Sequence, residues 1–270
     1  MKEFIKIMVF MLSGGMICSV FAQQTPVFTN YNYNTVIINP AHAGFYPDTD
    51  ITMTNLGYFN NIEGSPRNIG ITVNTPMGLR RVGLGAGVYS DQVGVTRTTS
   101  LFGAYAYKIN LDDDQRGGRW WNYNPSVLSF GITGGLTKYD ENLTALGITN
   151  DNEFANNVNA TMPTLGIGVL YNRERLFVRV LIKPSMLFKY EAGAPLQVEL
   201  NATFNYENKV EFGLGYKTNA SLNCLVGFRV TNHLRFIYNY NVTLKNTPIN
   251  NTHGIVLSYR FGDGFMKYSK

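Results

Sequence analysis

The feature of this chain that most restricts its fold is an alternation of apolar and polar residues with period two, which runs from residue 50 almost to the C-terminus. In residues 196–206, for example, leucine, valine, alanine, phenylalanine and tyrosine occupy every second position, and glutamine, glutamate, asparagine and threonine lie between them. Successive side chains of a β-strand point to opposite faces, so this pattern predicts strands with one apolar face. The sequence therefore predicts an all-β fold.

Twelve strands are predicted, and a range of 12–14 fits the pattern. They cover residues 50–59, 67–75, 81–90, 98–109, 126–139, 162–172, 175–190, 196–206, 209–217, 220–230, 233–242 and 252–261. An even number of strands, most of them close to the ~9–11 residues that cross a bilayer, is typical of bacterial single-chain membrane barrels. We therefore expect a transmembrane antiparallel β-barrel over residues 50–262.

The composition of the polar face separates a membrane barrel from a water-soluble one. This face consists mostly of glycine, serine, threonine and asparagine, and charged residues make up only 15% of the chain, against roughly 25% for an average soluble domain. Tyr105, Tyr171, Tyr216 and Tyr259 lie near strand ends on the apolar face, where membrane barrels carry aromatic girdles. We expect the apolar face to contact outer-membrane lipid. A soluble β protein of the periplasm remains an alternative.

The N-terminus predicts export from the cytoplasm. Lys2 and Lys6 are followed by the uncharged apolar residues 7–20 and by small residues before position 23, a pattern typical of a signal peptide over residues 1–22. A membrane anchor and lipidation at Cys18 are the alternatives. Residues 23–49 are then expected to form an N-terminal periplasmic or plug-like segment, and residues 263–270 a C-terminal tail.

Loop lengths predict the orientation of the barrel. Tight turns are expected at 172–174, 207–208 and 231–232, and they alternate with longer segments at 140–161, 191–195 and 243–251. Short turns normally face the periplasm and long loops the exterior. Pro184 lies inside a predicted strand, where it removes a ladder hydrogen bond, so a bulge, kink or strand break is expected there.

One predicted periplasmic connection, residues 110–125, is unusually long. It carries an acidic run and a pair of indoles, and we interpret it as a candidate partner-docking loop; a solvated loop is the alternative. The residues concerned are Asp112, Asp113, Asp114, Trp120 and Trp121.

No motif nominates a catalytic or metal site. His42, His233 and His253 are scattered without metal-ligand spacing, Cys224 is the only cysteine beyond the predicted signal, and no nucleophile elbow is present. The glycine-rich run 83–87 precedes no helix that could hold a phosphate, so its glycines are expected to narrow the inner wall or relieve curvature. No basic cluster with interleaved aromatics indicates nucleic-acid binding. We predict a non-enzyme without cofactor or metal.

The polar face carries an excess of basic residues over acidic ones. In an open pore this excess predicts a preference for anions, and in a closed one it predicts pairing with a plug; salt bridges along the wall are the alternative. The candidate lumen-lining charged residues are Lys108, Arg179, Lys183, Lys189, Glu199, Glu211, Lys217, Arg229, Arg235 and Arg260.

Short motifs in a fixed order resemble a known family. The segment Asn39-Pro40-Ala41-His42-Ala43-Gly44 is similar to the N-terminal signature of the PorP/SprF family, of which Asn39, Pro40, Ala41 and Gly44 are taken as signature residues. Further similar motifs are Gly64–Arg67, Asp91–Gly94, Lys183–Ser185, Tyr216–Asn219 and Thr252–Phe261. The chain departs from the family pattern between Tyr171 and Lys183, where two strands are missing by comparison. It also has Gly254 in place of the usual glutamate.

The resemblance implies a role in type IX protein secretion and gliding motility at the outer membrane. The implied partners are other type IX secretion components, including the periplasmic ring, and secreted adhesins with a C-terminal sorting domain. Residues 23–49 would fold against or into the periplasmic mouth. A general porin or small-solute channel is the alternative function, and a barrel enzyme is a more distant one.

Overall fold

A computed structural model describes residues 34–57, 64–78, 81–111, 126–148, 151, 154–173, 175–177, 180–189, 197–207, 209–218, 221–244 and 251–265. In these residues the strands are β1 (Asp50–Gly57), β2 (Arg67–Met77), β3 (Val82–Val93), β4 (Thr96–Asn110), β5 (Ser126–Glu141), β6 (Val158–Arg173), β7 (Arg175–Phe177), β8 (Val180–Lys189), β9 (Gln197–Tyr206), β10 (Val210–Lys217), β11 (Ser221–Arg229), β12 (Leu234–Thr243) and β13 (Asn251–Arg260). Three short 3-10 helices accompany them: η1 (Thr35–Ile37), η2 (Pro40–His42) and η3 (Leu143–Leu146).

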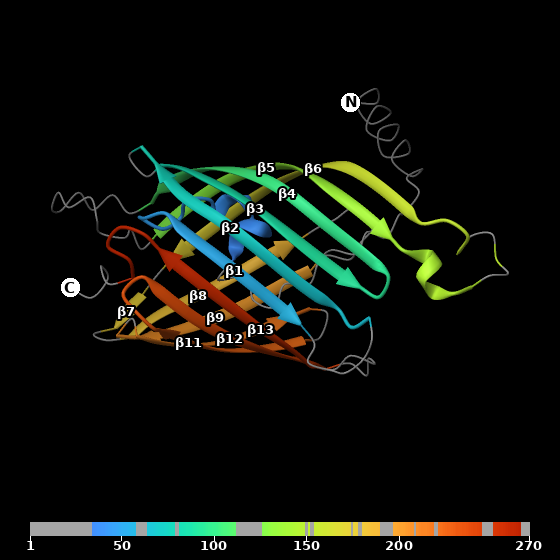
Figure 1. The fold of residues 1–270 in the computed structure, drawn as a ribbon. Helices are drawn as coiled ribbons and strands as arrows, with labels where there is room; N and C mark the ends of the chain where they lie inside the picture. The colour runs from blue at the N-terminus through green and yellow to red at the C-terminus, as the bar shows by residue number, and fades with distance from the viewer. Residues whose placement is uncertain are drawn as a thin grey trace, which may run out of the picture.

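The described strands form one antiparallel sheet that winds into a barrel wall (Figure 1). Chain neighbours pair in sequence from β1 to β6 and again from β7 to β13, and β1 pairs with β13 so that the two halves join. The registers are regular; in β4 and β5, for instance, Thr96 lies opposite Glu141 and Asn110 opposite Val127. The predicted all-β membrane barrel is thus confirmed, with strand positions close to those expected from the alternation.

The single strand predicted over residues 175–190 is two strands in the structure, β7 and β8. β6 and β7 are the first and the last strand in the strand order. Each strand is antiparallel to its neighbour, and twelve steps separate the two, so β6 and β7 run in the same direction. β7 follows β6 after one residue and then pairs with β8, Phe177 lying opposite Val180. The tight turn predicted at 172–174 is therefore wrong, because the chain stays extended through β7 and reverses only after Phe177. Because β7 continues β6 in the same direction, the thirteen described strands occupy twelve positions around the wall.

Pro184 does not break its strand. β8 continues through this residue, which lies opposite Ala202 of β9 in an uninterrupted register. The reversal that splits the predicted strand falls at 178–179, outside the described residues.

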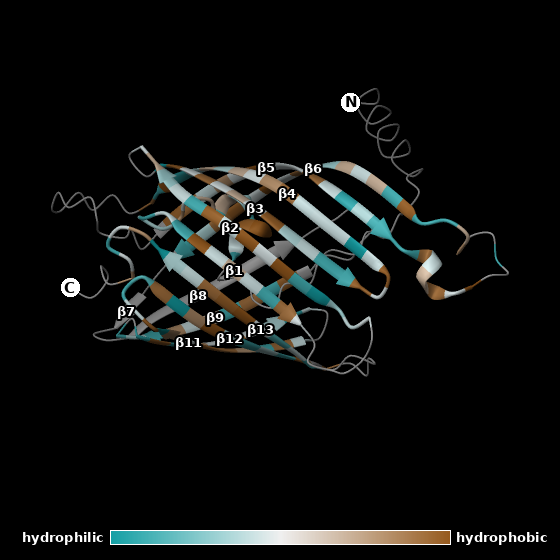
Figure 2. Ribbon diagram, in the orientation of Figure 1, coloured by the Kyte–Doolittle hydropathy of each residue, from teal (hydrophilic) through white to brown (hydrophobic). Residues whose placement is uncertain are grey.

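Hydrophobic and hydrophilic residues alternate along the strands (Figure 2), and the two faces of the wall differ accordingly. Inward-facing side chains are mostly buried and polar, such as Thr72, Ser129 and Asn239. Outward-facing side chains are large, apolar and exposed, and they include Leu101, Ile132, Phe212 and many of the tyrosines near strand ends. A water-exposed wall of this composition would be unfavourable, because contiguous apolar surface of this extent is normally covered by another apolar phase. In the described part of the chain, no helix is long and apolar enough to cross a membrane.

Candidate functional site

The barrel lumen is occupied by the segment that precedes the first strand. We call residues 34–44 the plug; it contains η1 and η2 and packs against the inner faces of β2 to β6. Val36 and Ala43 of the plug form an apolar cluster with Phe102, Ala104 and Ala106 of β4, and all five side chains are buried. In Figure 1 the plug is the blue segment seen through the wall.

Asn39 connects the plug to the wall and also shapes the plug itself. Its side-chain oxygen accepts a hydrogen bond from the backbone N–H of Ala41 at 3.0 Å, which caps η2 at its N-terminus. Its side-chain nitrogen donates to the carbonyl oxygen of Val169 on β6 at 2.9 Å. Asparagine can do both because its amide has a donor and an acceptor end, and Pro40 at the next position suits the start of a helix.

Glycines on the inner wall allow the backbone of the plug to approach closely. A Cβ added at Gly131 of β5 would lie 2.6 Å from the Cα of Ala41, and one at Gly168 of β6 would lie 2.8 Å from the Cδ of Pro40. A Cβ at Gly83 of β3 would lie 2.9 Å from the Cα of Gly44. These distances are far below ordinary carbon contacts of roughly 3.5–4.0 Å. We call Gly83, Gly131 and Gly168 the glycine floor.

Gly44 itself can only be glycine. Its φ is +54°, and a Cβ there would lie 2.6 Å from the Cα of Gly83. Positive φ is costly for residues with a side chain. The glycine of the signature is thus explained by both the turn and the close contact.

Polar wall residues hold the remainder of the plug. Ser129 donates to the carbonyl oxygen of Ala41 at 2.6 Å, and Thr72 donates to the side-chain oxygen of Asn34 at 2.6 Å. Lys108 is buried and donates its ammonium to the carbonyl oxygen of Gly44. These bonds satisfy buried polar groups that would otherwise be left without partners.

The segment before β1 and the segment after β13 meet at one end of the barrel. We call the end where β1 begins and β13 ends the proximal end. There the guanidinium of Arg260 lies 3.9 Å from the ring centre of Tyr46 and 4.4 Å from that of Phe265, and Arg235 lies 4.7 Å from the Phe265 ring. Arg260 and Phe265 are both buried. A cation between two aromatic faces is stabilised by the ring quadrupoles, so this stack ties the segments before β1 and after β13 together at the proximal end.

Several predicted lumen charges form ion pairs along the wall. Lys217 lies 2.9 Å from Glu199, and Arg235 lies 3.2 Å from Glu211, which also accepts a hydrogen bond from Asn205 at 2.9 Å. Glu199, Asn205, Glu211 and Arg235 are buried, and Lys217 is mostly buried.

Most of the other predicted site residues lie outside the part of the chain whose side chains the structure describes. Arg229 is half-buried on the inner face, and Arg179 lies outside the described residues, as do the side chains of Lys183 and Lys189. The predicted docking loop with Asp112, Asp113, Asp114, Trp120 and Trp121 also lies outside them. Within the described ranges, no group of three or more histidine, cysteine or acidic side chains is placed to hold a metal ion.

Sequence reasoning missed the glycine floor and the aromatic stack. The signal for the floor was present, because glycines recur at inward-facing positions on β3, β5 and β6. The stack carried no such signal, since Tyr46 and Phe265 lie outside the alternating strands and are separated by almost the whole chain.

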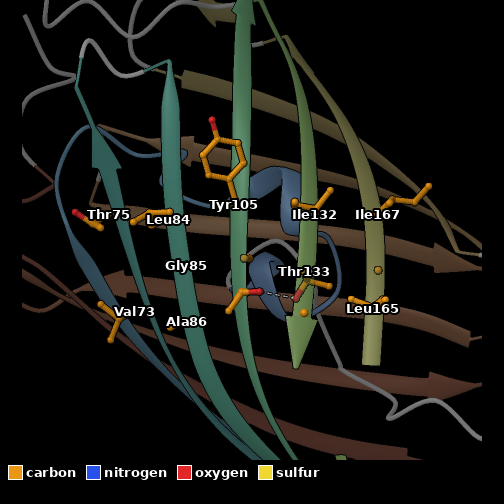
Figure 3. Close-up of a pocket in the computed structure, with 14 residues that line it drawn as sticks. Val73, Thr75, Leu84, Gly85, Ala86, Tyr105, Ile132, Thr133, Leu165 and Ile167 are labelled. Carbon is orange, nitrogen blue, oxygen red and sulfur yellow. Dashed lines mark hydrogen bonds between the residues drawn. The ribbon is translucent and has the colours of Figure 1, made fainter. Parts of the chain in front are cut away.

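The outer wall carries a shallow apolar hollow of about 870 Å³ (Figure 3). Ala86, Gly103 and Gly134 lie side by side across β3, β4 and β5 and supply almost no side chain. A neighbouring row of larger residues, Leu84, Tyr105, Ile132 and Ile167, forms one bank of this hollow. The hollow ends at β6.

An alternating wall, an apolar outer surface and an N-terminal segment packed inside the lumen against β2 to β6 together define an outer-membrane β-barrel with an internal plug segment. The family model of the type IX secretion system membrane protein PorP/SprF matches residues 20–181 and 178–259. The chain therefore belongs to the PorP/SprF family and is an outer-membrane component of type IX secretion.

Solved structures of similar architecture include other barrels. The translocator domain of autotransporter NalP from Neisseria meningitidis is 11% identical, with 80% of this chain and 89% of that chain covered and a TM-score of 0.40. The β domain of the Bordetella autotransporter BrkA is 10% identical, with 79% and 98% covered and a TM-score of 0.44. The P. putida toluene transporter TodX is 10% identical, with 86% and 94% covered and a TM-score of 0.42. Among proteins with curated descriptions, none matches this sequence.

Proposed function

We propose that this protein is a closed accessory barrel of type IX secretion, which assists the export or surface attachment of a large adhesin with a C-terminal sorting domain. In this role lipid covers the apolar outer wall, and the proximal mouth faces the periplasm. The barrel acts there as a docking platform for other secretion components, including the periplasmic ring. The role is non-enzymatic.

One observation carries the proposal: the family signature is used to build the plug. Asn39 and Pro40 shape η2, Ala41 accepts the bond from Ser129, and Gly44 fits against Gly83. A signature that places a segment of the chain inside the lumen, against β2 to β6, favours a platform over a conduit. It disfavours the alternative of a general porin, which needs an open, water-filled lumen.

The experiment is affinity purification of the tagged protein from detergent-solubilised outer membranes, followed by identification of co-purifying proteins. Gly83→Ala is the test variant, because its Cβ would displace the plug, and Gly103→Ala is the matched control, because its Cβ would meet nothing within 4 Å on the outer wall. We expect type IX components to co-purify with the wild type and Gly103→Ala and to be depleted with Gly83→Ala.

Two results would contradict the proposal. The first is a purified protein that brings down no secretion component in any form. The second is rapid uptake of small solutes by liposomes that contain the wild-type chain, which would favour the porin alternative.

A further inference from the structure

Aromatic contacts link the plug to the segment that follows β13. The ring of His42 in η2 lies 5.4 Å from that of Tyr46, whose ring centre is 3.9 Å from the guanidinium of Arg260. Arg260 in turn lies 4.4 Å from the ring centre of Phe265, which is 4% exposed. A change in the position of Phe265 is therefore transmitted to η2 through side chains that contact one another.

Backbone contacts fix the position of Phe265. Its N–H donates to the carbonyl oxygen of Asn232 at 2.8 Å. Gly264 has a φ of +66°, and a Cβ added there would lie 2.9 Å from Nδ1 of His233. Positive φ is readily adopted only by glycine, so the turn after β13 is specific and places Phe265 against Arg260.

The guanidinium of Arg260 is not fully satisfied in this position. Arg260 is 2% exposed, and in the described part of the chain its Nε and Nη2 have no hydrogen-bond acceptor. These two nitrogens form an edge of the guanidinium that can pair side-on with both oxygens of a carboxylate. The ring contacts stabilise the charge, but buried N–H groups without acceptors destabilise the same position.

A carboxylate for this edge lies directly across the ladder. Asp50 of β1 is opposite Arg260 in the register, and it is 3% exposed. Thr52 donates to its Oδ2 at 3.3 Å, and Asn74 is a further polar neighbour on β2, whereas among the described residues no donor lies within 3.5 Å of its Oδ1. Opposite residues have Cα atoms roughly 4.5–5.5 Å apart, so rotation of the Arg260 side chain is enough to bring its free edge to Asp50.

We propose that Arg260 is a two-position latch on the plug. In the first position, which the structure shows, it lies between Tyr46 and Phe265 and holds the plug at its proximal end. In the second position it forms an ion pair with Asp50 and releases both rings. The first position has ring contacts but lacks hydrogen bonds, and the second has the reverse, so the two free energies are of the same order.

The latch gives the plug a means of regulation. A ligand shifts such an equilibrium when it binds one of the two states better. This inference rests on the proposed function, because a secretion component docked at the proximal mouth would favour the second position by drawing Phe265 away from Arg260.

The test is the labelling rate of a single thiol in the plug, Val36→Cys in a Cys224→Ala background, with a maleimide added to outer membranes. Phe265→Leu keeps an apolar side chain but removes the ring, and we expect it to make labelling about tenfold faster. Phe261→Leu is the matched control, because Phe261 is 46% exposed and packs against Tyr259. This control should label at the parental rate.

A second substitution distinguishes a latch from ordinary packing. Asp50→Asn removes the charge that the second position requires, so in this background Phe265→Leu should accelerate labelling by less than about threefold. If Phe265 only packed against the mouth, the two changes would act independently, and the acceleration would remain about tenfold.

Fluorine NMR provides a measurement that keeps Arg260 and both rings. A fluorinated phenylalanine is placed at position 265 of the purified chain in detergent. We expect two resonances, one from the stacked ring and one from the released ring, and Asp50→Asn should remove the second.

The outcomes separate this inference from the proposed function. The latch is overturned by equal acceleration in both backgrounds, by equal rates for Phe265→Leu and Phe261→Leu, or by a single fluorine resonance that Asp50→Asn leaves unchanged. If type IX components still co-purify in those cases, the proposed function stands. If none co-purifies with the wild type, the proposed function fails, and the thiol rates still decide whether the latch exists.

Discussion

The substitution Gly83→Ala tests the close contact between the plug and the wall. The added Cβ would lie 2.5 Å from the carbonyl carbon of Ala43 and 2.9 Å from the Cα of Gly44. Normal carbon contacts are about 3.5–4.0 Å, so one backbone must move by about 1 Å. The atoms concerned are backbone on both sides, and no flexible side chain can turn aside to relieve the clash. Overpacking of this kind costs about 1–3 kcal/mol.

The assay is the reactivity of a single buried thiol in the plug. Val36 is 1% exposed, so Val36→Cys in a Cys224→Ala background reports displacement of the plug when a maleimide is added to outer membranes. A shift of about 2 kcal/mol toward the displaced state corresponds to about a 30-fold faster labelling rate. Gly103→Ala in the same background should label at the parental rate, since its Cβ meets nothing within 4 Å.

The reasoning fails if the thiol at position 36 stays as protected in Gly83→Ala as in Gly103→Ala. It also fails if the parental thiol reacts as fast as an exposed cysteine, because the plug would then not occupy the lumen.

Three further predictions follow from the same contacts. Asn39→Ala removes the bonds to Val169 and Ala41 and should destabilise the seated plug by about 1–3 kcal/mol, seen as faster labelling of Val36→Cys. Arg260→Met removes the cation from between Tyr46 and Phe265 and should lower the temperature at which the folded band converts on heat-modifiability gels, whereas Arg67→Met, on an exposed strand end, should not. Ile132→Lys places a charge on the outward apolar face and should destabilise the folded barrel by about 2–4 kcal/mol near the membrane centre. The effect is measured as a lower yield of folded barrel in the membrane, with Leu146→Lys in the exposed η3 as the control. Equal yields of the two variants would argue against lipid on this face.

The fold was predictable from the sequence because alternation and strand length are local properties. In β9 (Gln197–Tyr206) the large apolar residues Leu200, Phe204 and Tyr206 are exposed on the outer face, so the period of two predicted both the strand and its faces. The hairpin after Phe177 was not predictable in this way. The residues from 175 to 190 alternate well enough to be one strand, and only the pairing of β7 with β8 shows that the chain reverses within them.

The site was only partly predictable, because it depends on contacts between distant segments. The signature residues were identified as a group, and their position before the first strand indicated a plug-like segment. That Gly131 and Gly168 form a floor beneath them required knowledge of the registers, which bring three strands of the wall to one place. Arg260 was expected to face the lumen, but its partners Tyr46 and Phe265 lie at opposite ends of the chain.

The most direct measurement of the central claim is the conductance of the purified mature chain in planar lipid bilayers. If the plug closes the lumen, the wild-type protein should insert without sustained conductance, and Gly83→Ala should show frequent openings while Gly103→Ala remains closed. Stable, continuous conductance from the wild-type chain would contradict a closed barrel and with it the assignment of the signature to a plug.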